Sequence, residues 1–382
     1  MISQKKLVDT FLDLALIDGA SGNERLVADF LKSKLSELGL NVKEDNANKT
    51  FNGNAGNVIA HYPGTNKDML PYFIAAHMDS IAPTKNLKPV FTNGVIRSDG
   101  TTILGADDRV GVAVVLETIT YIVKNKIETG PIQIILTVGE EIGMFGSKNL
   151  TFDMVNSRFG FVFDSSASPG SIIVSAPSST HFIVKVLGKA AHAAVNPEQG
   201  INAIKIASDA ITKLKTGKIS ETCTMNFGLI NGGKAINIVP DQVIIEGDVR
   251  SLVNEESISK IEELKDTFNK SALKFGGKVE FKFIKKYETF NLSLDSNVVQ
   301  IAMNAIKEIG LNPKPIKYPG GSDANIFNKM GIPTVNLGLG YKNVHSKNES
   351  ISIQNLELSA KIGISIVKNA LFFSTKNELA VK

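Results

Sequence analysis

Short apolar runs alternate with longer segments of helical periodicity in the first part of the chain and again after about residue 290. The runs at 72–76, 132–138 and 159–163 contain few polar residues, which is typical of strands that are buried on both faces. Residues 109–123, 296–309 and 356–373 instead repeat apolar side chains at helical spacing. With further strands near residue 316 and at 334–337, the pattern predicts an α/β domain with a mostly parallel sheet covered on both faces.

The segment between these two parts has a different pattern. Residues 181–187, 222–229, 242–250 and 278–285 alternate as strands, and residues 201–214 and 255–275 have the periodicity of helices. The order strand, helix, strand, strand, helix, strand is that of a ferredoxin-like α+β unit. We therefore expect one domain formed by residues 1–177 and 291–382, with residues 178–290 inserted as a second domain.

Three local signals refine the first domain. Ser21-Gly-Asn-Glu24 has the sequence of a capping box and predicts a helix start, because the serine and the glutamate can satisfy each other's free amides. Asn93-Gly94 predicts a two-residue hairpin turn within 90–97. Residues 57–62 and 72–76 are predicted to be neighbouring strands joined through a turn at Pro63-Gly64.

Composition narrows the class of protein. The 382 residues include 42 Lys and Arg against 38 Asp and Glu, and the basic residues are scattered, so nothing indicates a nucleic-acid partner. The single cysteine, Cys223, excludes an internal disulfide and a cysteine-based zinc site, and it fits a reducing compartment. No stretch has the length and apolarity of a membrane span, and the N-terminus lacks the pattern of a signal peptide. We therefore expect a cytoplasmic protein that needs no membrane.

Side chains with the chemistry of metal ligands follow several of the predicted strands or precede a helix. Each has an ordinary explanation, because aspartates often cap helices, acidic pairs occur in exposed turns, and a lone histidine is commonly a loop residue. Those explanations are weaker when taken together, because the strand ends of an open α/β sheet meet at one edge. The residues are His77, Asp79, Asp107, Asp108, Glu140, Glu141, Asp164 and His345.

Two histidines and several carboxylates suit a pair of borderline divalent ions such as zinc, cobalt or manganese, bridged by one carboxylate and one water. Two cations that share a water lower its pKa towards neutrality, and a nearby carboxylate that is not a ligand can accept the proton. The sequence therefore predicts a site for two divalent ions, whose chemistry would suit hydrolysis.

These residues resemble the M20 family of di-zinc metallopeptidases, and in particular its peptidase T-like, tripeptidase branch. The resemblance rests on His77-Met-Asp79, Gly105-Ala-Asp107-Asp108, Gly139-Glu140-Glu141, Asp164 and His345, and it covers nearly the whole chain. It implies that the chain binds two Zn²⁺ ions per subunit, with Co²⁺ or Mn²⁺ as alternatives. By the resemblance Asp107 bridges the ions, His77 and Asp164 complete one site, and Glu141 and His345 complete the other.

The same resemblance implies roles for two further acids and for the inserted segment. Glu140 becomes the general base, and Asp79 orients His77. The inserted domain becomes a lid that also carries a homodimer interface, and its His192 stabilises the oxyanion in the partner's site. The positions that match those holding the backbone or terminal carboxylate of a short peptide substrate are Arg250, Asn237, Gly320, Gly321 and Ser322.

Alternatives stay open at this point. The M42 aminopeptidases have a similar ligand set, but their inserted domain lies between the His-x-Asp strand and the bridging aspartate. Here that interval is only about 30 residues, which is too short for a domain. The expected activity is that of an exopeptidase that releases the N-terminal residue of a tripeptide. An N-acyl-amino-acid deacylase, a carboxypeptidase on the same scaffold, and a binding protein without activity are the other hypotheses.

Overall fold

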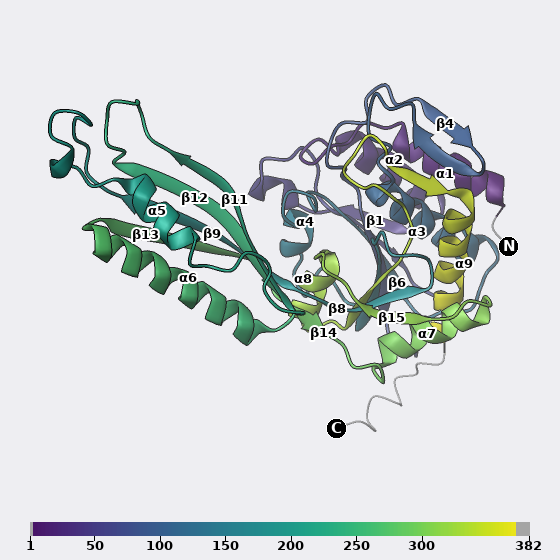
Figure 1. Ribbon diagram of the computed structural model, residues 1–382. Helices are drawn as coiled ribbons and strands as arrows, with labels where there is room; N and C mark the ends of the chain where they lie inside the picture. Colours follow the sequence, from purple (N-terminus) through teal and green to yellow (C-terminus); the bar gives the residue numbers. More distant parts are fainter. Residues whose placement is uncertain (1–2, 372–382) are drawn as a thin grey trace. The chain divides into compact units, whose positions relative to one another are not determined.

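The computed structural model describes residues 3–371 and divides into two compact units (Figure 1). The first unit consists of the chain up to Val174, Leu292–Lys317, and the chain from Ser322 onward. The second unit consists of Ser175–Asn291 and Tyr318–Gly321. Each unit has its own hydrophobic core.

A mixed sheet forms the centre of the first unit. Its strand order is β1-β2-β6-β3-β7-β16-β8-β14, with β15 paired to β8. The four central strands, β6, β3, β7 and β16, run parallel to one another. This confirms the predicted α/β class. The strands are β1 (Asn41–Glu44), β2 (Val58–Tyr62), β3 (Tyr72–His77), β6 (Ile132–Thr137), β7 (Phe159–Phe163), β8 (Ser171–Ala176), β14 (Phe290–Asn291), β15 (Lys314–Lys317) and β16 (Thr334–Leu337).

The prediction that 57–62 and 72–76 are neighbouring strands is wrong. Strand β6 lies between β2 and β3, antiparallel to β2 and parallel to β3. All six residues of β6 are buried, whereas β2 ends in the half-buried His61 and Tyr62. The strand that is apolar throughout therefore occupies the inner position, although it comes later in the chain.

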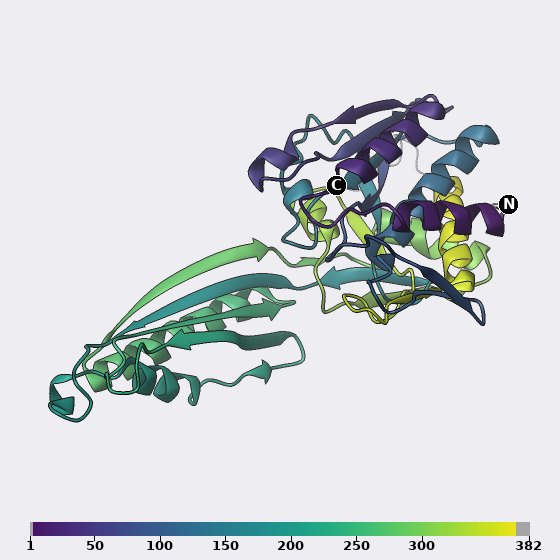
Figure 2. The same cartoon turned by 90° about the horizontal axis from the view of Figure 1, so that it is seen from above.

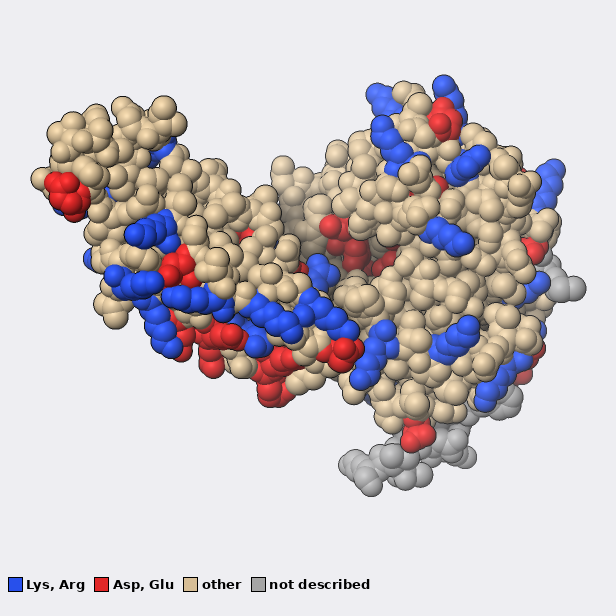
Figure 3. Space-filling model, viewed as in Figure 1, with Lys and Arg blue, Asp and Glu red and all other residues tan. Residues whose placement is uncertain are grey.

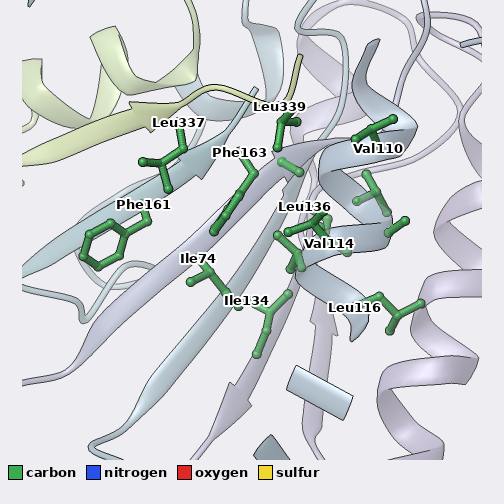
Figure 4. Close-up of a cluster of buried hydrophobic side chains, with 14 of the residues drawn as sticks. Ile74, Val110, Val114, Leu116, Ile134, Leu136, Phe161, Phe163, Leu337 and Leu339 are labelled. Atoms are coloured by element: carbon green, nitrogen blue, oxygen red, sulfur yellow. The ribbon is translucent and has the colours of Figure 1, made fainter. Parts of the chain in front are cut away.

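Five helices pack their apolar residues into one cluster with the sheet. Figure 4 shows Val110 and Val114 of α3 beside Ile134, Leu136 and Phe163 of the strands. Gly111 permits this close approach, because a Cβ at this position would lie 2.0 Å from the carbonyl oxygen of β7's last residue. The five helices are α1 (Gln4–Ala15), α2 (Arg25–Glu37), α3 (Ala106–Lys124), α7 (Asn297–Glu308) and α9 (Ile353–Ala370). The predicted end of the last helix at Phe373 lies outside the described residues.

Two shorter helices belong to the same unit. In α8 (Asp323–Lys329), Phe327 packs on Phe73 of β3 with ring centroids 4.3 Å apart. Phe73 and its neighbour Ile74 point to opposite faces of the strand, so α8 covers the face away from α3. Helix α4 (Phe145–Lys148) contacts α8 and the short 3₁₀ helix η1 (Ala47–Thr50). The sheet is thus covered on both faces, as the apolar runs predict.

The predicted capping box at Ser21 and Glu24 does not form. Helix α2 begins at Arg25, and neither side chain caps it by the expected bonds. The Ser21 hydroxyl instead donates to Asp79 Oδ2 at 2.6 Å. Glu24 is fully buried, and its Oε1 accepts the amides of Gly22 and Gly139. Tertiary partners at the ends of β3 and β6 therefore take the two side chains away from their local role.

The predicted hairpin is confirmed. Strands β4 (Pro89–Thr92) and β5 (Val95–Ser98) pair antiparallel on either side of Asn93-Gly94. Strand β17 (Ser350–Ser352) joins them through β5 and makes a three-stranded sheet. This small sheet anchors the chain that follows His345.

The second unit has the predicted ferredoxin-like order. Its antiparallel sheet runs β10-β11-β12-β9-β13, and α5 and α6 lie along it (Figure 2). Helix α5 ends at Ile211, three residues earlier than expected. The elements are β9 (Ser178–Leu187), η2 (Pro197–Gln199), α5 (Ala203–Ile211), β10 (Gly217–Lys218), β11 (Cys223–Gly232), β12 (Gln242–Ser251), α6 (Asn254–Phe275) and β13 (Lys278–Tyr287).

Within residues 3–371, none of the helices combines the length and the apolarity that crossing a bilayer requires. The longest helix, α6, carries many charged residues along its length.

Candidate metal centre

The carboxyl ends of the parallel strands bring the predicted ligands together. His77 is the last residue of β3, Asp164 directly follows β7, and Glu141 follows β6 by four residues. Because parallel strands end at the same edge of a sheet, these three side chains converge on one place. The chain after β16 continues through a loop to His345. The edge of the sheet therefore explains why residues far apart in sequence meet.

Two groups of candidate ligands share one aspartate. In the first, His77 Nε2 lies 3.2 Å from Asp107 Oδ1 and 3.7 Å from Asp164 Oδ1. In the second, His345 Nε2 lies 3.3 Å from Asp107 Oδ2 and 3.0 Å from Glu141 Oε2. In each group the ligand atoms all lie within 4.8 Å of one another. The two carboxylate oxygens of Asp107 thus face different groups, which is the geometry of a bridging ligand.

Asp79 lies behind His77. It is fully buried, and its Oδ1 is 3.3 Å from His77 Nδ1, whose other near neighbour is the Asp79 carbonyl oxygen at 3.1 Å. The Asp79 carboxylate also accepts the amides of Glu140 and Glu141 at 3.0 and 3.2 Å. Two acceptors at Nδ1 favour the tautomer with its proton there, which leaves Nε2 free to bind a cation.

The adjacent acids Asp107 and Asp108 do different things. Asp108 is fully buried; its Oδ2 accepts the His77 amide at 3.2 Å and its Oδ1 accepts the Gly111 amide at 3.1 Å. The second bond closes the first turn of regular helix in α3, so the ordinary explanation, a helix cap, is correct for Asp108. Asp107 has no such partner and points to the two histidines.

The site holds an excess of buried negative charge. Burial raises the pKa of Glu140 well above its usual range, and repulsion from Asp164, Asp323 and Glu141 adds to the effect. The pKa values of Asp164 and Glu141 are raised too, mainly by burial. Figure 3 shows acidic side chains set back into the surface of the first unit, while lysines and arginines are spread over both units. A divalent cation would relieve this repulsion.

The residues present fit a pair of divalent ions. Each group offers one imidazole nitrogen and carboxylate oxygens, a donor set that suits zinc, cobalt or manganese. Glu141 Oε1 is buried and has no hydrogen-bond partner among the described residues, so it also has capacity for a cation. The donor types, their convergence and the unpaired oxygen all fit the binding of divalent ions.

Two residues that the sequence did not single out support this arrangement, together with Asp323, which the sequence placed only in the turn that begins at Gly320. The Tyr341 hydroxyl donates to Asp107 Oδ1 at 3.2 Å and to Asp164 Oδ1 at 3.1 Å. Glu349 accepts amides of the turn that carries Asp107. Asp323 receives hydrogen bonds from the hydroxyls of Thr137 and Ser147. The only sequence signal for Tyr341 was its place in the glycine-rich loop after a predicted strand, where its side chain had no predicted partner.

The predicted substrate residues lie mostly in the second unit. His192, Asn237 and Arg250 are exposed there. His192 Nδ1 accepts the amides of Ala194 and Val195, each at 3.2 Å, and Arg250 Nε donates to Asp248. Gly320 and Gly321 also belong to this unit, whereas Ser322 caps α8 in the first. None of these residues belongs to the two ligand groups that the described residues form.

Comparisons with known proteins agree with the fold and the site. Residues 73–369 match the model of peptidase family M20/M25/M40. A crystal structure of a tripeptidase from Staphylococcus aureus superposes with a TM-score of 0.94 at 39% identity, covering 97% of this chain and 99% of that one. The aminopeptidase PepT of Bacillus cereus gives a TM-score of 0.92 at 36% identity with the same coverage of both chains.

The protein YqjE of Bacillus subtilis is 40% identical over 370 residues, which is 97% of this chain and 100% of that protein. The alignments therefore extend across both units and include the segments that carry the candidate ligands. The chain belongs to peptidase family M20/M25/M40, in its peptidase T-like branch, and is a metallopeptidase.

Proposed function

We propose that the protein is a di-metal aminopeptidase that releases the N-terminal residue of tripeptides. One observation carries the proposal: two ligand groups share Asp107, and Glu140, which belongs to neither group, interacts electrostatically with their members His77 and Asp164. The similarity to a tripeptidase and to an aminopeptidase supports the choice of substrate.

The metal ligands in this proposal are the members of the two groups. His77 and Asp164 would hold one ion, Glu141 and His345 the other, and Asp107 both. Zinc is the proposed ion, because two imidazoles with carboxylates suit it, and cobalt or manganese could replace it. When bound, such a pair supplies Lewis acidity and lowers the pKa of a shared water.

Glu140 is the proposed general base. Its amide is fixed by Asp79 Oδ1, and its carboxylate interacts electrostatically with His77 and Asp164. A Glu140 oxygen would take the proton from the attacking water and deliver it to the leaving amine. Asp79 holds His77 in the tautomer that presents Nε2, as its two contacts with Nδ1 support. In both roles the residue is oriented by hydrogen bonds within the first unit.

Substrate recognition in the proposal uses the second unit and the glycine turn. Arg250, Asn237 and the turn Gly320-Gly321-Ser322 would hold the backbone and the terminal carboxylate of the peptide, for which an arginine and backbone amides are apt donors. His192 would stabilise the developing oxyanion. The exposure of His192, Asn237 and Arg250 supports a role in contacts with another molecule.

A homodimer through residues 178–290 is also part of the proposal. Strand β10 pairs with β11 only at Thr224 and Met225, and among the described residues no strand covers the outer edge of β11 beyond them. Leu229 and Ile230 on this stretch are 66% and 61% exposed. An open strand edge with exposed apolar side chains favours pairing with another chain. Light scattering of the purified protein tests the assembly directly.

A cytoplasmic location completes the proposal. The one cysteine, Cys223, is a buried free thiol, which is compatible with a reducing compartment. Fractionation of cells that express the native chain tests this.

The deciding experiment compares one tripeptide in three forms: free, N-acetylated and C-amidated. We expect rapid cleavage of the free peptide with release of the N-terminal residue, and little cleavage of the acetylated form. Preferred cleavage of the acetylated form would instead indicate a deacylase, and release of the C-terminal residue a carboxypeptidase. Dialysis against a chelator should abolish the activity, and added Zn²⁺ should restore it.

A further inference from the structure

Glu349 is a buried carboxylate that belongs to neither ligand group. Its residue is 1% exposed, and its two oxygens are used in hydrogen bonds with backbone amides more than 240 residues away in sequence. We infer that Glu349 is a positioning residue for the metal centre, which fixes the bridging Asp107 relative to the loop that carries His345. The inference rests on the proposed function, because it concerns affinity for the proposed ions.

The contacts of Glu349 are directed at the turn before α3. Its Oε2 accepts the Gly105 amide at 2.7 Å, and its Oε1 accepts the Asp107 amide at 2.9 Å. Gly105 has a left-handed backbone with φ of 70°, and Asp107 has a non-helical backbone with ψ of 106°. The start of a helix leaves amides without intrahelical partners, and a carboxylate that accepts two of them forms short, charge-assisted bonds. Glu349 thus holds the backbone of Asp107 in the conformation that points the Asp107 carboxylate at both groups.

The other end of this link is the loop around His345. Lys342 and Ser350 bond to each other in both directions, N to O at 2.8 and 3.0 Å, and close the loop between them. Ser350 begins β17, which pairs with β5. The Glu349 amide donates to the Ser346 carbonyl at 3.1 Å inside the loop. Glu349 therefore connects a loop that is anchored in the small sheet to the turn that carries Asp107.

Two other roles fit the contacts less well. A role as an additional metal ligand would require a free oxygen near the imidazoles, but both Glu349 oxygens are directed at amides. A packing role alone would be met by any side chain of the same size. The distinctive property of Glu349 is a pair of acceptors, so the test must change the acceptors and keep the volume.

The variant Glu349→Gln makes that change. The amide group keeps one acceptor oxygen and turns an NH₂ towards the second backbone amide, so one of the two bonds is lost. A matched control is Glu117→Gln in the same unit. Glu117 is 4% exposed, and its oxygens accept from Lys6 and Thr10 at 2.8 Å each. It lies about 15 Å along α3 from Asp107, by the rise of 1.5 Å per residue.

The measurement is Zn²⁺ affinity and stoichiometry, by competition with a chromophoric chelator, on full-length metal-free proteins. We expect two ions per chain for the wild type and for Glu117→Gln. For Glu349→Gln we expect the affinity for at least one ion to fall about 10- to 100-fold, the range for residues that orient metal ligands. A smaller Zn²⁺-induced rise in the melting temperature should accompany it.

The outcomes separate this inference from the proposed function. Wild-type Zn²⁺ affinity in a folded Glu349→Gln protein would overturn the inference and leave the di-metal centre intact. A wild-type chain that binds fewer than two ions would overturn both. If Glu349→Gln does not fold, Glu349→Asp is measured in the same way, because it keeps two acceptors but is one methylene shorter. Weakened Zn²⁺ binding in that variant would support the inference, and wild-type binding would overturn it.

Discussion

The polar residues of the two units are held in opposite ways. In the first unit, His77 is 2% and Asp79 0% exposed, and each has partners 30 or more residues away in the chain. In the second unit, Arg250 has a side chain that is 43% exposed and bonds to a neighbour two residues away. All members of the two ligand groups come from the first unit. The second has donors that face solvent.

In the proposed function, this difference separates the residues for chemistry from those for substrate recognition. Burial and mutual repulsion raise the pKa values of the carboxylates in the first unit, so the charge of the site itself indicates a cation. The exposed donors of the second unit gain their strength only when a partner covers them, because water screens an open ion pair. Substitutions in the two units should therefore affect different kinetic constants.

The largest effect should come from Glu140→Ala in the first unit. Loss of the base should lower kcat for a tripeptide by about 10²- to 10⁴-fold, since general acid–base catalysis contributes that much. Both metal ions should stay bound, because Glu140 belongs to neither ligand group. Steady-state kinetics together with elemental analysis measure the two quantities. Near wild-type turnover would remove Glu140 from the mechanism.

Removal of one ligand should act on metal binding first. His345→Ala is expected to lower the metal content from two ions per chain towards one, because His345 belongs to the second group only. The matched control is His61→Ala, since His61 is a half-buried histidine of β2 outside both groups. Elemental analysis after dialysis gives the stoichiometry. Two tightly bound ions in His345→Ala would show that the second group is assigned wrongly.

In the second unit the effect should be on KM. Arg250→Ala should raise KM for the free tripeptide about 10- to 100-fold, as a lost hydrogen bond to a charged group implies. KM for the C-amidated tripeptide should change little, because that peptide has no terminal carboxylate. Arg97→Ala on β5, where the arginine bonds to Thr92, serves as the control. An equal loss on both peptides would contradict carboxylate recognition.

The smallest effect should come from Glu44, a carboxylate that is already paired with the side chains of Arg25 and Lys32. Burial alone would raise the pKa of Glu44, but Arg25 and Lys32 lower it to about 2, against a usual value of 4.5. Because the folded pKa is the lower one, this stabilisation is present above about pH 4.5 and is lost as the pH falls towards 2.

We therefore expect Glu44→Gln to cost about 1 kcal/mol of unfolding free energy at pH 7, after allowance for solvent screening of half-exposed partners. The difference from the wild type should disappear in acid. Urea unfolding at several pH values measures it, with the exposed Glu37→Gln on α2 as the control. A difference that does not depend on pH would contradict the ion-pair account.

Much of the fold could be predicted from the pattern of apolar residues, and the predictions that were missing or wrong have physical causes. Strand β7 and strand β16 appear where predicted, because their apolar runs are buried throughout. The four-residue β1 alternates between exposed and half-buried positions at the sheet edge, so its pattern was too weak to detect. The positions of β2 and β6 in the sheet depend on which strand is apolar on both faces. A prediction that pairs strands in the order of the chain does not take this into account.

The candidate site was predictable only in part for a similar reason. Ligand types such as His77 and Asp164 carry their chemistry in the residue name and stand at strand ends. Tyr341 and Glu349 act through bonds to residues more than 170 positions away, and nothing in their local sequence marks those partners. Ser21 shows the converse. Its capping-box motif is present in the sequence, but its hydroxyl donates to the buried carboxylate of Asp79 instead.

The neighbours Asp107 and Asp108 have the same side chain and cannot exchange roles. Asp108 acts on the protein itself, since it ties the His77 backbone at the end of β3 to the first turn of α3 through two amides. Hydrogen–deuterium exchange should therefore find those two amide protons protected even in the metal-free protein. The role of Asp107, in contrast, becomes measurable only when metal ions bind. An engineer who wished to retune the metal preference of this enzyme would alter residue 107 or its surroundings and leave residue 108 untouched.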